Sequence, residues 1–99
     1  MPSSAQRVFR LRTLVRNLEF DRAAFEDLAW WVAQDRKKAL RIMRLIQETQ
    51  TDPFGGIGKP EPLKRDLAGC WSKRIDDEHR LVYQVLDQKI RVLACRYHY

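Results

Sequence analysis

The residues that could support acid–base chemistry in this chain are few and lie mainly in its C-terminal half. Glu61 lies in a loop rich in proline and glycine, and His98 and Tyr99 are the last two residues. Together with a cation such as Arg80, these groups suit metal-independent RNA cleavage. A base removes the ribose 2′-OH proton, an acid protonates the departing 5′-oxygen, and cations stabilise the charge on phosphorus.

Each of these groups also has a plainer interpretation. His79, the other histidine, lies in a charged turn, and we expect it at the surface. A terminal histidine such as His98 is more often incidental than catalytic. Arg74, Arg80 and Arg96 fall on predicted strands, where they fit equally well the exposed face of a one-sided sheet.

Several other chemistries lack their sequence signals. Cys70 and Cys95 lie far apart without CxxC spacing, which argues against a disulfide framework or a cysteine-based zinc site. The sequence contains no serine in a nucleophile-elbow pattern, no GxGxxG and no GxxxxGK[ST]. We therefore expect no cofactor and no metal, and free thiols in a reducing cytosol.

The elements that would position these residues form an α+β fold. Asp21 and Asp35 are candidate N-caps of two helices, and the three prolines and three glycines of TDPFGGIGKPEP end the second one. The order is an N-terminal strand, two helices on one sheet face, then a twisted antiparallel meander. The predicted strands are Val15–Phe20, Cys70–Ile75, Arg80–Leu86 and Lys89–Tyr99.

Helical spacing predicts which side chains of the two helices are buried. We expect the predicted stripes to be Phe25, Leu28, Ala29 and Val32 in the first helix, and Ala39, Ile42, Met43 and Ile46 in the second. Lys38 and Arg41 lie toward the other side, as either a solvated face or a partner contact. Trp30 and Trp31 are adjacent, so we expect one of them to cover a surface or a subunit contact.

The register of the last two predicted strands decides whether the candidate site forms. A two-residue turn at Asp87–Gln88 would place Arg80 opposite Cys95, with His98 facing away. A three-residue loop would pair Arg80 with Arg96 and bring His98 to the same face. A slip of one residue inverts the answer, and the sequence leaves both registers open.

The net charge of +6 is concentrated at the N-terminus, where the first 16 residues hold four arginines and no acid. We expect residues 1–14 to be a disordered basic extension and residues 15–99 to be a single domain. Weak nucleic-acid contact, targeting, and a true translation start near Val15 are alternatives for the extension. No apolar run approaches the ~20 residues of a membrane helix, so we expect no membrane contact.

Three motifs, in order, resemble the YoeB toxins, the Txe/YoeB branch of the RelE-like superfamily. They are KPEPL at 59–63, GCWSKRIDDEHRLVY at 69–83 and ACRYHY at 94–99. The resemblance implies a microbial ribonuclease fold and a cytoplasmic toxin of a bacterial type II toxin–antitoxin pair. Such toxins cleave mRNA in the ribosomal A site. It also implies a YefM-like antitoxin, operator DNA binding through the antitoxin complex, and a homodimer.

The resemblance further assigns roles residue by residue. Glu61 would be the general base, Arg80 would stabilise the phosphorane, His98 would be the general acid, and Tyr99 would position substrate or acid. The expected RNA-contacting residues are Lys59, Lys64, Lys73, Arg74 and Arg96. Cys70 stands where an aromatic residue is common and Lys73 where arginine is common. Because lysine does not reproduce a bidentate arginine contact, Lys73 favours a weaker RNA or ribosome contact.

Two competing functions remain from the sequence. One is a catalytically inactive module that docks on the ribosome, RNA or antitoxin. The other is a general nucleic-acid-binding protein whose affinity depends on the basic extension and falls steeply with salt.

Overall fold

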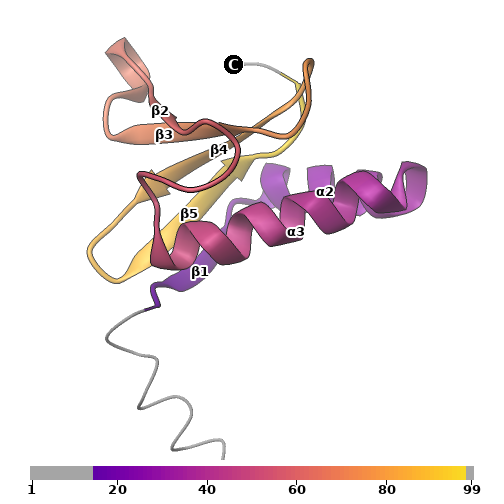
Figure 1. Ribbon diagram of the computed structural model, residues 1–99, viewed down its shortest axis with the longest axis horizontal. Helices are drawn as coiled ribbons and strands as arrows, with labels where there is room; N and C mark the ends of the chain where they lie inside the picture. Colours follow the sequence, from indigo (N-terminus) through magenta and orange to yellow (C-terminus); the bar gives the residue numbers. More distant parts are fainter. Residues whose placement is uncertain (1–14, 98–99) are drawn as a thin grey trace, which may run out of the picture.

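The computed structural model describes residues 15–97, which form one mixed sheet with two helices packed on one side of it (Figure 1). The predicted basic extension and the two terminal site candidates, His98 and Tyr99, lie outside the described residues. The elements, in order, are β1 (Asn17–Phe20), α2 (Arg22–Gln34), α3 (Arg36–Thr51), β2 (Glu61–Pro62), the 3-10 turn η1 (Arg65–Leu67), β3 (Cys70–Arg74), β4 (Arg80–Val85) and β5 (Lys89–Ala94).

The strands run in the spatial order β1-β5-β4-β3-β2. Strands β3 to β5 pair antiparallel, as the sequence predicts. Strand β2, in the segment predicted as a loop, adds antiparallel to β3, and β1 joins the β5 edge parallel. The α+β prediction is confirmed, with β1 making the sheet mixed. The last strand ends at Ala94 rather than reaching the chain end, and Tyr97 has a φ of 63°, outside strand geometry.

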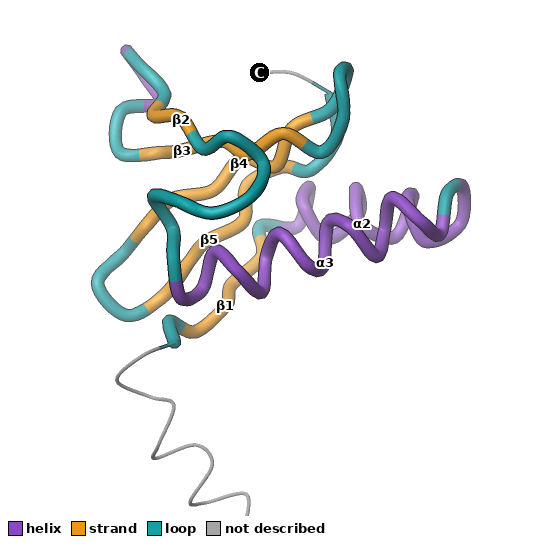
Figure 2. Tube along the Cα trace, viewed as in Figure 1, coloured by secondary structure: helices purple, strands orange, loops and turns teal. Residues whose placement is uncertain are grey.

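Both helices begin where their aspartates predict. The Asp35 side chain accepts the Lys38 backbone N–H at 3.2 Å, which satisfies one orphan donor at the start of α3. Asp21 occupies the N-cap position of α2 without a side-chain capping bond. After α3, the loop with its prolines and glycines runs back to the sheet and reaches β2 (Figure 2).

The main core lies between the helices and the facing side of the sheet. Helix α3 contributes Ala39, Ile42 and Ile46 as predicted, while Met43 is 47% exposed. Of the predicted face of α2, Leu28 packs against the core. The rest of that prediction is wrong, because Phe25 and Val32 are about 60% exposed and Ala24 and Trp31 are buried instead. Both sets have helical spacing, but the Trp31 set buries the larger ring and gives its indole N–H a partner, the Cys95 carbonyl at 2.7 Å.

Candidate active site

The candidate site lies on the sheet face opposite the helices, and strand register assembles it. Glu61 pairs with Ser72 across β2 and β3, and Arg74 pairs with Arg80 across β3 and β4. Paired residues project to the same face, and residues two apart on one strand also share a face. Glu61, Ser72, Arg74 and Arg80 therefore share one face, while their neighbours Leu81 and Tyr83 enter the core beneath the helices.

This site face has its own small apolar floor. Leu63, Cys70 and Val82 form a second buried cluster, separate from the main core. Ser72 is also fully buried there, and its hydroxyl lies 3.5 Å from Nη1 of Arg80. The floor and this hydroxyl limit where the half-buried Arg80 guanidinium can lie.

The two site arginines repel each other unless an anion lies between or near them. Arg74 and Arg80 are directly opposite across β3 and β4, and like charges in that relation are destabilising. Both side chains are only half-buried, so a ligand can reach them. A phosphate is the kind of anion that offsets this repulsion, because guanidinium groups bind its oxygens through paired N–H donors.

Glu61 reaches this face on a short edge strand. Pro60 and Pro62 flank Glu61, and both lack the N–H that a central strand needs. This segment therefore suits a sheet edge. The Leu63 N–H donates to the Cys70 carbonyl at 2.9 Å and holds the strand in register. Glu61 is exposed, as are Lys59 before it and Lys64 after it. The side chains of Glu61, Lys59 and Lys64 are thus all available to solvent.

Lys73 does not lie where the resemblance implied. It alternates with the site residues on β3, so its side chain enters the core and has no exposed surface. Its Nζ lies 3.7 Å from the Glu48 carboxylate and donates to the Asp52 carbonyl at 3.3 Å. Burial lowers the pKa of Lys73, and the carboxylates of Glu48 and Asp52 partly offset that effect. This placement argues against the expected RNA contact and gives Lys73 a structural role.

Glu48, Lys73 and Tyr83 hold the loop that leads to Glu61, and we call these three residues the loop clamp. Glu48 accepts the Ile57 N–H at 2.6 Å, and the Tyr83 hydroxyl donates to the Pro53 carbonyl. Burial raises the pKa of Tyr83, so the phenol stays a donor. A side chain at Gly56 would place its Cβ 1.7 Å from the Glu48 carboxylate oxygen, at a φ of 81°. The clamp therefore depends on glycine at that position.

A β-bulge resolves the two registers that the sequence left open. The hairpin turn has two residues, because the Leu86 N–H donates to the Lys89 carbonyl. The pairing then shifts by one residue between Val82 and Tyr83, where the bulge inserts an extra residue in β5. Beyond the bulge the Arg80 N–H donates to the Tyr97 carbonyl at 3.1 Å. The structure thus combines the two-residue turn of the first alternative with the Arg80–Arg96 register of the second.

Arg96, a predicted RNA contact, packs against α2. Its guanidinium lies 3.6 Å from the ring centroid of Trp30, and its Nη2 donates to the Tyr97 hydroxyl at 2.8 Å. Stacking on an indole is a favourable cation–π arrangement. Trp30 is thus the tryptophan that covers the outer surface, and its partner is this arginine. Contact of Arg96 with RNA stays a prediction.

His79 is buried, which contradicts the expectation of a surface histidine. The residue is 7% exposed, its ring lies edge-on to that of Trp31 at 4.8 Å between centroids, and its Nδ1 accepts the Tyr97 N–H at 2.7 Å. The charged turn suggested exposure, but the ring folds inward between α2 and the chain segment after β5. The sequence carried no signal for this, nor for Ser72 or Glu48, because each role depends on strand register or loop packing.

Comparison with known proteins identifies the family of this chain. Residues 20–99 match the sequence profile of the family described as "YoeB-like toxin of bacterial type II toxin-antitoxin system". This chain belongs to the YoeB toxin family. It is 59% identical over 85 residues to a YoeB toxin of Mycobacterium bovis, covering 86% of this chain and 100% of that one. A YoeB toxin of Streptomyces coelicolor is 51% identical over 82 residues, covering 83% and 98%.

Solved structures extend the likeness to the fold. The YoeB dimer of Staphylococcus aureus is 42% identical, with a TM-score of 0.79 over 85% of this chain and 98% of that one. The heterotetrameric YoeB–YefM complex of S. aureus covers the same shares at a TM-score of 0.77. YafQ of Escherichia coli, at 19% identity and a TM-score of 0.65, covers 84% and 93% and shares the fold. None of the helices described here is long and apolar enough to cross a membrane.

Proposed function

We propose that this YoeB-family toxin is a ribosome-dependent endoribonuclease that cleaves mRNA in the A site and so stops translation. The observation that supports it most is the cross-strand pair of Arg74 and Arg80 beside Glu61, on a sheet face that the helices leave open. Such a pair favours a phosphate, and a carboxylate beside it can remove a nearby proton.

The proposed reaction needs no group from outside the protein and the RNA. Glu61 takes the proton of the ribose 2′-OH, and the oxygen attacks the adjacent phosphorus. Arg80, with Arg74, stabilises the negative charge that builds up on the pentacoordinate phosphorus. His98 protonates the departing 5′-oxygen, and Tyr99 positions the substrate or the acid. The product strand ends in a 2′,3′-cyclic phosphate.

The proposed partners follow from the relatives. YoeB and YefM form a complex in S. aureus, and YoeB of that organism forms a dimer. We infer that this chain likewise binds a YefM-like antitoxin, forms a homodimer, and contacts operator DNA through the antitoxin complex. Ribosome-bound mRNA as substrate would place the toxin in the cytoplasm.

The test is mRNA cleavage on programmed ribosomes by the untagged protein and by the variants Glu61→Ala and His98→Ala. We expect cuts in the A-site codon that disappear when the product of the neighbouring antitoxin gene is added. Loss of a general acid or base costs about 10²–10⁴-fold. Unchanged cutting by either folded variant would contradict its role, and ribosome binding without any cut by the wild type would favour the inactive docking module.

The basic extension tests the third candidate function. A protein whose RNA affinity depends on residues 1–16 would lose most of that affinity when the basic extension is deleted, and the loss would be largest at low salt. We expect A-site cleavage by the truncated protein to match that of the full chain, because the site arginines lie on the sheet.

A further inference from the structure

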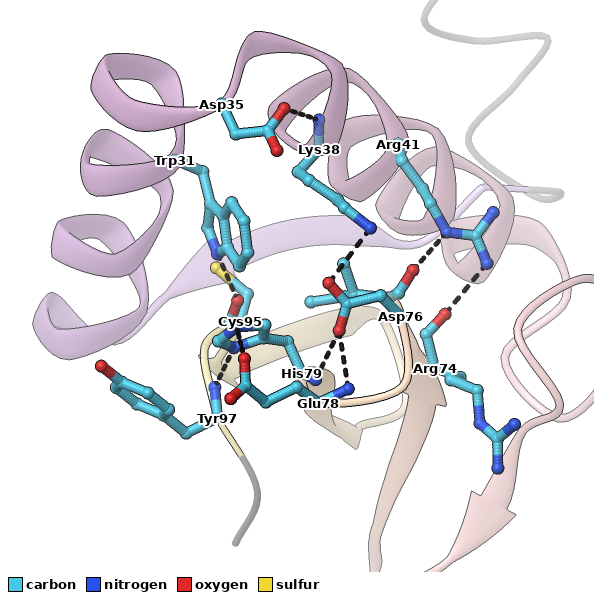
Figure 3. A network of polar contacts seen from close by, with 11 residues as sticks. Trp31, Asp35, Lys38, Arg41, Arg74, Asp76, Glu78, His79, Cys95 and Tyr97 are labelled. Carbon is cyan, nitrogen blue, oxygen red and sulfur yellow. Dashed lines mark hydrogen bonds and ion pairs between the residues drawn. The ribbon is translucent and has the colours of Figure 1, made fainter.

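A network of polar contacts fixes the turn between β3 and β4 (Figure 3). Oδ1 of Asp76 accepts the backbone N–H groups of Glu78 at 2.8 Å and His79 at 2.7 Å. Its other oxygen forms an ion pair with Lys38 of α3 at 3.1 Å, and Arg41 of α3 donates to the Ile75 carbonyl at 2.7 Å. Lys38 and Arg41 of α3 therefore hold this turn, where the sequence suggested a solvated face or a partner contact for them.

This turn places His79 against the segment that follows β5. Nδ1 of His79 accepts the Tyr97 N–H, and Nε2 lies 3.1 Å from the Glu78 carboxylate. A backbone N–H can only donate, so Nδ1 carries no hydrogen in this contact. The hydrogen of the neutral ring is then on Nε2, where it points at Glu78. Trp31 packs edge-on against the ring, which restricts its rotation.

Tyr97 is held at both ends of its backbone. Its N–H donates to His79, and its carbonyl accepts the Arg80 N–H at 3.1 Å. Its φ of 63° lies in the left-handed region, which is unfavourable for a residue with a side chain such as tyrosine. Two hydrogen bonds and the ring contact with His79, at 5.3 Å between centroids, offset that cost. The next residue along the chain is His98.

We propose that His79 is a positioning residue for RNA cleavage: its Nδ1 fixes the backbone of Tyr97, the residue that precedes the proposed general acid His98 in the sequence. The proposal rests on the proposed function, because His98 is the general acid there. His79 does not touch the substrate in this account and acts through the chain end. A misplacement of about 1 Å at a catalytic group can cost about 10²-fold in rate.

Two substitutions separate the hydrogen bond from the bulk of the ring. His79→Leu removes the Nδ1 acceptor, so the Tyr97 N–H loses its hydrogen-bond partner. His79→Asn places its amide oxygen where Nδ1 lies, because both atoms are bonded to Cγ. Ile46→Val, on α3 and 4% exposed, is a matched control that removes one buried methyl group and leaves every hydrogen-bonding group of this network in place.

The experiment measures single-turnover cleavage on programmed ribosomes, as the rate at saturation and the ribosome concentration at half-saturation. We expect His79→Leu to lower the saturating rate about 10–100-fold at unchanged half-saturation, and His79→Asn to recover most of the loss. Ile46→Val should match the wild type. The proposal is overturned if His79→Leu behaves like Ile46→Val, if His79→Asn is as slow as His79→Leu, or if only half-saturation changes.

A second readout does not depend on cleavage. Nitrogen NMR of the imidazole should show the Nε2–H tautomer, and exchange of the Tyr97 amide should accelerate in His79→Leu relative to Ile46→Val. A wild type that folds but cuts no mRNA would defeat the proposed function. An active wild type whose Tyr97 amide exchanges equally fast in both variants would instead defeat the role of His79.

Discussion

Breaking the loop clamp at Glu48 should destabilise the protein far more than breaking a surface ion pair. The Lys73 side chain has no exposed surface, whereas that of Glu48 is 30% exposed. Glu48→Gln keeps an oxygen for the Ile57 N–H but leaves the buried ammonium without its carboxylate. Removing one partner of a fully buried pair costs about 3–5 kcal/mol, and the partial exposure of Glu48 brings our expectation to about 2–3 kcal/mol.

The assay is equilibrium unfolding in denaturant, supported by thermal melting. For a domain of this size each kcal/mol corresponds to about 4–8 °C, so Glu48→Gln should melt roughly 10–20 °C below the wild type. The matched control is Glu26→Gln, which breaks the surface ion pair with Arg22. The side chain of Glu26 is 66% exposed and that of Arg22 is 92% exposed. We expect the control to cost under about 0.5 kcal/mol.

A second substitution tests whether the uncompensated charge causes the loss. Lys73→Met removes the ammonium at similar volume, so the double variant with Glu48→Gln should recover most of the stability that Glu48→Gln loses. The reasoning is refuted if Glu48→Gln falls within error of Glu26→Gln, or if the double variant is no more stable than Glu48→Gln.

Three further outcomes follow from buried groups. Burial raises the pKa of Cys95 to about 12 and also raises that of Cys70, so iodoacetamide at pH 8 should modify neither thiol in the folded protein, as read by mass spectrometry. Burial raises the pKa of Asp76, but its hydrogen bonds outweigh this and leave it below 3.8. The stability that the ionised Asp76 carboxylate contributes should be complete above pH 3.8 and should be lost as the pH falls through the lowered pKa. The melting temperatures of Asp76→Asn and wild type should therefore converge in acid. Trp31→Phe leaves a buried carbonyl without its donor and should cost about 1–3 kcal/mol in denaturant unfolding.

The sequence predicts most of the fold because its boundary signals are local. Asp35 marks the start of α3 through its own side chain, and the prolines and glycines after Thr51 allow neither helix nor central strand. No local signal of this kind decides which face of α2 is buried. Phe25 and Trp31 both fit a helical stripe, and the Cys95 carbonyl favours burial of the Trp31 stripe.

The sequence identifies the residues of the candidate site, but it does not predict the contacts that hold them in place. Glu61, Arg74 and Arg80 share a face, as the proposed function requires, yet the register beyond Val82 depends on a bulge that no turn residue signals. The burial of His79 is likewise set by tertiary packing, because the ring folds inward from a charged turn. Such contacts lie between segments far apart in sequence, where residue type carries little information.

The central claim is that the 2′-OH of the A-site codon attacks the adjacent phosphate. The most direct measurement compares two ribosome-bound mRNAs that differ only by one 2′-deoxy nucleotide at the mapped cleavage position. The account predicts that the untagged toxin cuts the all-ribose mRNA, leaves a 2′,3′-cyclic phosphate, and fails to cut the substituted one at that position. Cleavage of the deoxy mRNA at the same bond, or no cleavage of either by folded protein, would contradict it.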